Sequence, residues 1–188
     1  MPAGEHAVYL TFDDGPHPQV TPWVLTELKK YNAQATFFCV GENVLRYPEV
    51  YKSIIAAGHS VGNHTQHHVN GWHVTTETYS ADVRAAAGVI DSRLFRPPYG
   101  RIKKAQAAQI KDAMQKQDAK IIMWDVLSAD FDTTFAPEKC LQIVLKNTTD
   151  GSIIVFHDSE KAAPNLQYAL PKVLEELARR KYVFKRLE

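Results

Sequence analysis

The 188-residue sequence has little net charge, few cysteines and no long apolar run. Its 22 basic and 21 acidic residues give a formal net charge of +1, which offers no electrostatic basis for binding nucleic acid or an anionic membrane. No apolar stretch is long enough to span a bilayer. The first residues, MPAGEHAVYL, do not combine a charged segment with an apolar one as a secretory signal does, so the residues leave the compartment open.

The two cysteines, Cys39 and Cys140, lie far apart and form no C-x-x-C pattern. They fit either two buried thiols or one disulfide, and burial is the favoured expectation. The sequence also lacks internal repeats, low-complexity tracts and linkers. Hydrophobic residues make up 45% and charged residues 23%, as in globular domains, so we expect one domain over residues 1–188.

Short apolar and β-branched runs alternate with helical patterns along the chain. Strands are predicted near residues 7–12, 35–40, 60–63, 94–96, 120–124, 153–156 and 182–187. The helices predicted between them cover residues 22–31, 48–57, 76–90, 103–116, 137–147 and 166–180. Thr21 is predicted to cap the first helix, and Pro171 falls inside the last, although proline suits only a first turn. This alternation predicts an α/β fold of parallel strands, as an open sheet or a barrel.

Residues able to carry out chemistry directly follow five of the predicted strands. These segments are DDGP at 13–16, HTQHH at 64–68, PPYG at 97–100, VLSAD at 126–130 and HDS at 157–159. In parallel α/β folds the carboxyl ends of the strands converge on one face, where active sites form. The sequence therefore predicts a single site at this face.

Two carboxylates and three histidines are candidates for a metal site. The DDGP turn explains Asp13 and Asp14 as loop residues, but neighbours at a strand end point in different directions. One carboxylate can thus bind a cation while the other remains a base. On a helical turn His64 and His68 would be neighbours and His67 would face elsewhere. Two imidazoles and one carboxylate leave open positions on a metal, as in catalytic sites, whereas solvated loop histidines are the alternative.

A competing pattern is GHSVG at 58–62, which places Ser60 where a serine nucleophile would stand. Asp125 or Asp130 and then His157 follow in the chain order of an α/β-hydrolase. Such an elbow needs a strand before the serine and a helix after it, whereas the order predicted here is the reverse. A serine hydrolase, which would react with a fluorophosphonate and ignore chelators, is therefore disfavoured.

Together these segments resemble the five motifs of the polysaccharide deacetylases, the NodB-homology domain of carbohydrate esterase family four. The matching segments are TFDDGP at 11–16, HTQHH at 64–68, RPPYG at 96–100, DVLSADF at 125–131 and VFH at 155–157. They occur in the family's order and span nearly the whole chain. The resemblance implies a distorted (β/α) barrel of about seven parallel strands. It also suggests the bacterial periplasm or cell envelope, with the cytoplasm as an alternative, and we expect a monomer.

The resemblance implies that Asp14, His64 and His68 bind one divalent cation, with Zn²⁺ favoured and Co²⁺ or Ni²⁺ as alternatives. The cation would polarise an acetamide carbonyl and acidify a water. Asp13 would then be the general base.

The resemblance assigns roles to residues of the last three motifs as well. Arg96 would pair with Asp13 and orient it. The backbone N–H of Tyr99 would help to hold the oxyanion. His157 would protonate the leaving amine, held in its charged form by Asp130.

The implied substrate pocket includes Pro98, Phe131, Val155 and Trp72. Phe131 and Val155 replace the tryptophan and leucine usual in the family, so the shape of the acyl pocket differs. Trp72 fits either a sugar-stacking role or packing within its loop. The implied reaction removes N-acetyl, or O-acetyl, groups from an acetylated carbohydrate such as chitin fragments or peptidoglycan. A catalytically silent glycan- or metal-binding barrel and a deformylase or amidase acting on a small molecule are the alternatives.

Overall fold

The computed structural model describes residues 6–188. In chain order the elements are β1 (Ala7–Asp13), α1 (Val20–Lys30), β2 (Ala35–Cys39), α2 (Gly41–Arg46), α3 (Pro48–Ala56), β3 (Ser60–Asn63), α4 (Thr76–Ala87), β4 (Leu94–Phe95), the 3-10 helix η1 (Pro98–Gly100), α5 (Lys104–Ala108), α6 (Ile110–Met114), β5 (Lys120–Ile121), β6 (Val126–Leu127), α7 (Pro137–Asn147), β7 (Ile153–His157), α8 (Ala163–Arg179) and β8 (Val183–Phe184).

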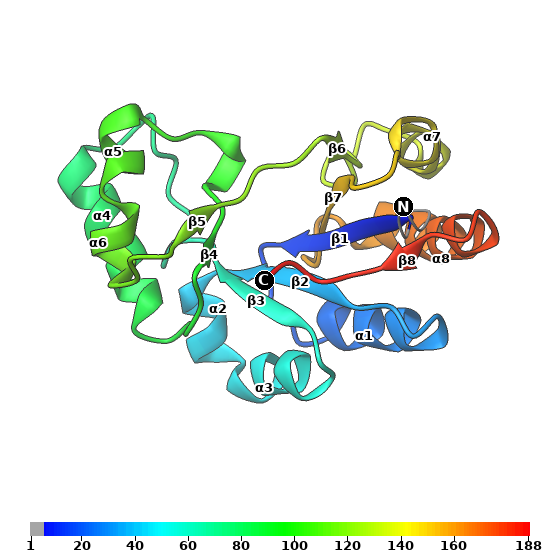
Figure 1. The fold of residues 1–188 in the computed structure, drawn as a ribbon, viewed down its shortest axis with the longest axis horizontal. Helices are drawn as coiled ribbons and strands as arrows, with labels where there is room; N and C mark the ends of the chain where they lie inside the picture. The colour runs from blue at the N-terminus through cyan, green and yellow to red at the C-terminus, as the bar shows by residue number, and fades with distance from the viewer. Residues whose placement is uncertain (1–5) are drawn as a thin grey trace, which may run out of the picture.

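The strands form one parallel sheet in the order β5-β4-β3-β2-β1-β7-β6, and β8 pairs with the start of β1. The sheet curls, with helices along its outside (Figure 1). Its two end strands, β5 and β6, are not paired with each other in the described part of the chain, so the barrel stays open. Residues 122–125 run across this opening. The predicted distorted (β/α) barrel is thereby confirmed, with β8 as a short addition to seven strands.

The central strands are apolar because helices cover the sheet. Six of the seven residues of β1 and all five of β2 are buried, as expected for parallel strands with both faces covered. Figure 1 shows α4, α5 and α6 grouped beside β4 and β5, and α7 and α8 at the other end of the sheet. The helix α8 buries a stripe of residues at helical spacing: Leu166, Ala169, Leu170, Val173, Leu174 and Leu177.

The structure corrects several predicted elements. The strand β6 and the helix α2 were not predicted, because two strand residues and a six-residue helix carry no periodic signal. The predicted 103–116 helix is broken at Gln109 into α5 and α6. The last helix begins before Pro171 and contains it. Thr21 lies within α1, whose cap residue is Gln19, so the predicted cap is wrong.

Both cysteines are buried free thiols, as expected. Among residues 6–188 no helix has the length and apolar character needed to cross a membrane.

Candidate active site

A cavity of about 430 Å³ opens at the carboxyl ends of the strands. Its lining combines polar residues at strand ends with aromatic and aliphatic residues: Asp13, Asp14, His64, His68, Tyr99, Trp124, Leu127, Phe131, Val155, His157, Ser159 and Lys161. Cavities of this size accept small ligands or one unit of a larger one. The structure thus brings residues from successive strand ends into one place.

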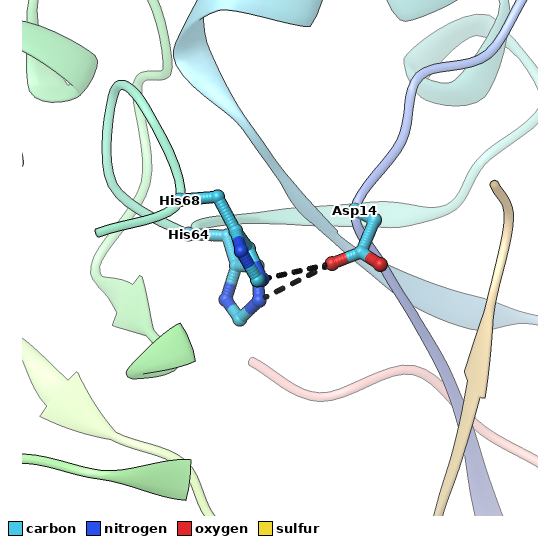
Figure 2. A group of neighbouring side chains, drawn as sticks. All are labelled: Asp14, His64 and His68. Carbon is cyan, nitrogen blue, oxygen red and sulfur yellow. Dashed lines mark ion pairs between the residues drawn. The ribbon is translucent and has the colours of Figure 1, made fainter. Parts of the chain in front are cut away.

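Three potential metal ligands meet on one side of the cavity (Figure 2). The Oδ1 atom of Asp14 lies 3.1 Å from Nε2 of His68 and 3.7 Å from Nε2 of His64. One ligand atom from each residue lies within 4.8 Å of the others. The two histidines do not stand on a helical turn as expected. The loop instead bends through left-handed conformations at Thr65 (φ 65°) and His68 (φ 53°).

The surroundings of these side chains suit a cation. The Nδ1 atom of His64 lies 2.7 Å from the Arg96 carbonyl oxygen. Because a carbonyl only accepts, Nδ1 carries the proton and the lone pair of Nε2 faces the cluster. Burial lowers the pKa of His64 to about 4, so its imidazole is neutral at pH 7.

The Oδ1 atom of Asp14 faces the imidazoles of His64 and His68. This atom is buried and accepts no well-oriented hydrogen bond. Burial raises the pKa of this carboxyl, but the imidazoles of His68, His157 and His64 lower it well below its usual range overall. An ionised carboxylate oxygen that faces two imidazole nitrogens fits a divalent metal with nitrogen and oxygen ligands.

Asp13, the last residue of β1, has a different set of partners. The Nη1 atom of Arg96 donates hydrogen bonds of 2.7 Å to Oδ1 of Asp13 and to Oγ1 of Thr11. Arg96 is fully buried, and its guanidinium lies 4.1 Å from the centre of the Phe38 ring. A buried guanidinium of this kind keeps the neighbouring carboxylate oriented. The carboxylate of Asp13 is thus held in one orientation beside the Asp14, His64 and His68 cluster.

His157, the last residue of β7, forms a pair with Asp130. Its Nδ1 atom lies 2.7 Å from Oδ1 of Asp130, and its backbone N–H donates to Oδ2 at 2.8 Å. Burial lowers the pKa of His157, but the Asp130 carboxylate and more distant acids raise it to about 9. The imidazole therefore carries a proton at pH 7 and is suited to act as an acid.

The sheet register sets the positions of Asp13 and His157 relative to each other. Asp13 and His157 are paired residues of the neighbouring parallel strands β1 and β7. Paired residues of adjacent strands project from the same face of a sheet. Both side chains therefore reach the cavity from the middle of the sheet.

The predicted pocket residues differ in position. Phe131 and Val155 line the cavity, and the Phe131 ring meets the His157 ring edge-on at 5.1 Å. Tyr99 also lines it, in a left-handed conformation (φ 59°) with its ring against His68. The cavity lining does not include Pro98, which is buried in η1, or Trp72, whose ring lies 4.8 Å from the Arg101 guanidinium.

Four lining residues received no role from sequence reasoning: Trp124, Leu127, Ser159 and Lys161. Trp124 lies in the segment that crosses the open side of the barrel. Gly100 (φ 64°) makes room for it, since a Cβ at that position would lie 2.7 Å from Cη2 of Trp124. The glycine that follows RPPY in the third motif was the feature of the sequence that could have indicated a close neighbour such as Trp124. Ser159 belongs to the HDS segment at 157–159 but received no role from the sequence, and Lys161 lies outside all of the segments noted there.

Other candidate residues lie outside this cavity. Ser60 begins β3, at the end of the strand opposite to His64, and a helix precedes it. The elbow geometry is therefore absent at Ser60. His67 is 60% exposed and its Nδ1 lies 2.6 Å from Oδ1 of Asp82. Asp125 accepts hydrogen bonds from Ser152 and from the backbone of Ile153, a structural tie.

Comparison with known proteins agrees with this arrangement. Residues 1–118 match the family model described as polysaccharide deacetylase. A peptidoglycan-N-acetylglucosamine deacetylase of Bacillus cereus is 33% identical over 98% of this chain and 87% of its own length. A chitooligosaccharide deacetylase of Azorhizobium caulinodans is 34% identical over 82% of this chain and 74% of its own.

A solved structure supports the same relationship. The crystal structure of a peptidoglycan N-acetylglucosamine deacetylase, in complex with an N-hydroxybenzamide compound, superposes with a TM-score of 0.88. The two sequences are 32% identical, and the match covers 99% of this chain and 88% of the other.

The curled sheet and the polar residues at its strand ends are those of a carbohydrate deacetylase. The chain belongs to the polysaccharide deacetylases of carbohydrate esterase family four.

Proposed function

We propose that the protein is a metal-dependent hydrolase that removes N-acetyl groups from an amino-sugar glycan of the peptidoglycan or chitooligosaccharide type. One observation carries this proposal. The cluster of Asp14, His64 and His68 shares a cavity with the buried base Asp13 and the charged acid His157. The names of the relatives, which are deacetylases of these two glycan classes, support the choice of substrate. They also favour the cell envelope as the place of action.

Asp14, His64 and His68 would hold one divalent cation, with Zn²⁺ favoured by two imidazoles and one carboxylate and Co²⁺ or Ni²⁺ as alternatives. When bound, such a cation supplies Lewis acidity, which polarises the acetyl carbonyl and lowers the pKa of water. The Arg96 carbonyl, bonded to Nδ1 of His64, orients one ligand.

Asp13 takes a proton from the attacking water while the water oxygen bonds to the acetyl carbon. Its hydrogen bond from Arg96 holds the carboxylate in place and leaves its second oxygen, Oδ2, on the side of His64 at 4.0 Å. The backbone N–H of Tyr99 donates to the oxyanion that forms on the carbonyl oxygen.

The carbon–nitrogen bond then breaks, and His157 gives its proton to the leaving amine. Asp130 holds the ring of His157 and stabilises its charged form. The products are acetate and the free amino sugar. Phe131, Val155 and Leu127 supply the apolar part of the lining, which suits the methyl group of the acetyl.

Acetate release tests this proposal directly. Peptide-free peptidoglycan glycan and chitooligosaccharides are each incubated with chelated protein and with protein reloaded with Zn²⁺, Co²⁺ or Ni²⁺. We expect acetate only after reloading. A chain that binds Zn²⁺ without releasing acetate from either glycan would be a silent barrel. Formate released only from small formamides, or acetate released only from small acetamides, would identify a small-molecule amidase.

A further inference from the structure

Two polar residues of the cavity have no part in the proposed hydrolysis. Ser159 and Lys161 both lie on the loop that joins β7 to α8, shortly after His157. The other lining residues are metal ligands, the base, the acid, or aromatic and aliphatic side chains. The cavity therefore has one wall whose chemistry remains unassigned.

The side chains of Ser159 and Lys161 form no hydrogen bond or ion pair with the residues that the structure describes. The charge of Lys161 acts on the exposed carboxylate of Asp132, but that carboxylate accepts both of its hydrogen bonds from Thr134. An exposed lysine needs no partner. What sets Lys161 apart from other exposed lysines is its position, because it is the only lysine or arginine among the residues that line the cavity.

Among the residues that line the cavity, none compensates the charge of Lys161. Arg96 neutralises Asp13, and Asp130 neutralises the His157 imidazolium. The two positive charges of a divalent cation would outweigh the single negative charge of Asp14. The loaded cavity would then be positive before Lys161 adds its own charge. A wall of this kind attracts an anion and gives a neutral sugar no electrostatic advantage.

We propose that Lys161, with the Ser159 hydroxyl, binds a carboxylate of the glycan. The substrate is then an acetylated glycan that carries a carboxylate close to the sugar that loses its acetyl group, as a lactyl-bearing amino sugar does. This inference rests on the proposed function and refines its substrate class. One ammonium and one hydroxyl suit a singly charged carboxylate, whereas phosphate groups are more often held by forked guanidinium groups or several donors.

A matched pair of substrates tests the inference. Peptide-free peptidoglycan oligosaccharides keep their lactyl carboxylates, and the same oligosaccharides converted to methylamides lose only the charge. For the Zn²⁺-loaded protein, we expect kcat/KM to be higher on the free acid. In Lys161→Ala the ratio of kcat/KM on the acid to that on the methylamide should fall about fivefold, as for a partly exposed charge contact.

Two further variants separate charge recognition from general damage. Lys161→Arg keeps the charge and should keep most of the ratio. Lys172→Ala removes an exposed lysine of α8 that lies outside the cavity lining, and the ratio should stay at the wild-type value. High salt should lower the wild-type ratio and leave that of Lys161→Ala nearly constant.

The possible failures are distinct. An unaltered ratio in Lys161→Ala, or an equal loss on both substrates, overturns carboxylate binding and leaves the proposed deacetylation intact. A loaded wild-type protein that releases acetate from chitooligosaccharides but from neither peptidoglycan oligosaccharide overturns the inference alone. Absence of release from all of these glycans overturns the proposed function, and the inference with it.

Discussion

The adjacent carboxylates at the end of β1 have different surroundings. Asp13 accepts a hydrogen bond from the buried Arg96, whereas Asp14 lies beside two imidazoles. Asp14 adopts a left-handed conformation (φ 80°), which directs its side chain away from that of its neighbour. Two residues of the same type can therefore serve as base and as ligand.

Replacing Asp13 with asparagine is expected to lower kcat at least about a hundredfold, within the range typical of a general base. Asparagine retains the shape and an oxygen for Arg96 but cannot take a proton. Acetate release and metal content should be measured on the same sample, and we expect the metal to be retained. Asp91→Asn, which alters a carboxylate that is 90% exposed, is the matched control. Loss of metal from Asp13→Asn would make Asp13 a ligand instead.

In the proposed mechanism, the pair of His157 and Asp130 sets the alkaline limit of the reaction. The Asp130 carboxylate raises the pKa of His157 to about 9. The imidazole is therefore protonated, and able to donate a proton, below that pH, and it is neutral above it. Asp130→Asn removes the largest raising influence. We expect the alkaline limb of kcat/KM to move to lower pH by about one unit or more.

The pH profile should be recorded for both proteins at equal metal loading, because a bound cation also lowers the pKa of a nearby imidazole. Asp132→Asn, two positions away and exposed, is the control and should leave the limb in place. A limb that stays fixed in Asp130→Asn would contradict the assignment of His157 as the acid.

Most side chains of the cavity were predictable because they directly follow strands. The conformation of the loop at 64–68 was not, since left-handed residues such as Thr65 and His68 depend on tertiary contacts rather than on local preference. Lys161 carried no signal either, because its relation to the cavity arises only from the path of the loop.

Among the connections between strands, Asp158 joins the ends of β1 and β7. The carboxylate is fully buried and accepts hydrogen bonds from the Gly15 backbone at 3.0 Å and from Thr21 Oγ1 at 2.5 Å. Its own N–H donates to the Asp13 carbonyl at 3.1 Å. Gly15 has to be a glycine here, because a Cβ would lie 2.1 Å from Oδ2 of Asp158. The turn that carries Asp13 and Asp14 is thus fixed to the end of β7, the strand that carries His157.

Asp158→Ala is expected to lower the free energy of unfolding by about 1–3 kcal/mol, since it leaves the buried Gly15 N–H without its acceptor. Deacetylation should fall as well, because the turn loses its anchor. Asp158→Asn keeps one acceptor oxygen and should lose less of both. Chemical denaturation of the two variants gives the comparison. Equal, wild-type stability in both would show that the carboxylate does not anchor the turn.

Long elements were predictable from apolar periodicity, as the match of α7 with residues 137–147 shows. Short ones were not. The helix α2 begins at Gly41, a poor helix former, and its backbone is held by the 64–68 loop through N–H donors of Gly41 and Glu42. Such an element exists because of contacts distant in sequence, which a local pattern cannot report.

For the molecule as a unit, a bound cation would connect β1 to the loop after β3. A ligand that binds only the native state stabilises it, by about 2.7 kcal/mol at a hundredfold excess over Kd. We therefore expect the Tm of chelated protein to rise on titration with Zn²⁺. The rise should be lost in His64→Ala and kept in His67→Ala, a neighbouring histidine outside the cavity lining. Equal rises in both variants would place the cation elsewhere.

The choice between an open sheet and a barrel was beyond periodicity, because both architectures use the same strand and helix patterns. The resemblance to the family motifs indicated the barrel. Neither periodicity nor the family motifs could predict how far the barrel closes. The strand β6 has only two residues, and the gap beside it depends on how residues 122–125 pack.

The pairing of Asp13 with His157 in neighbouring strands has one last consequence. The hydrogen-bond ladder of the central sheet, and not the mobility of a surface loop, fixes the distance between the two groups proposed to accept and return the proton. No closing motion is then required to assemble these two groups. Differences in the sugars accepted should arise at the rim, in the connections after β5 and β7, where the chain can vary without altering that spacing.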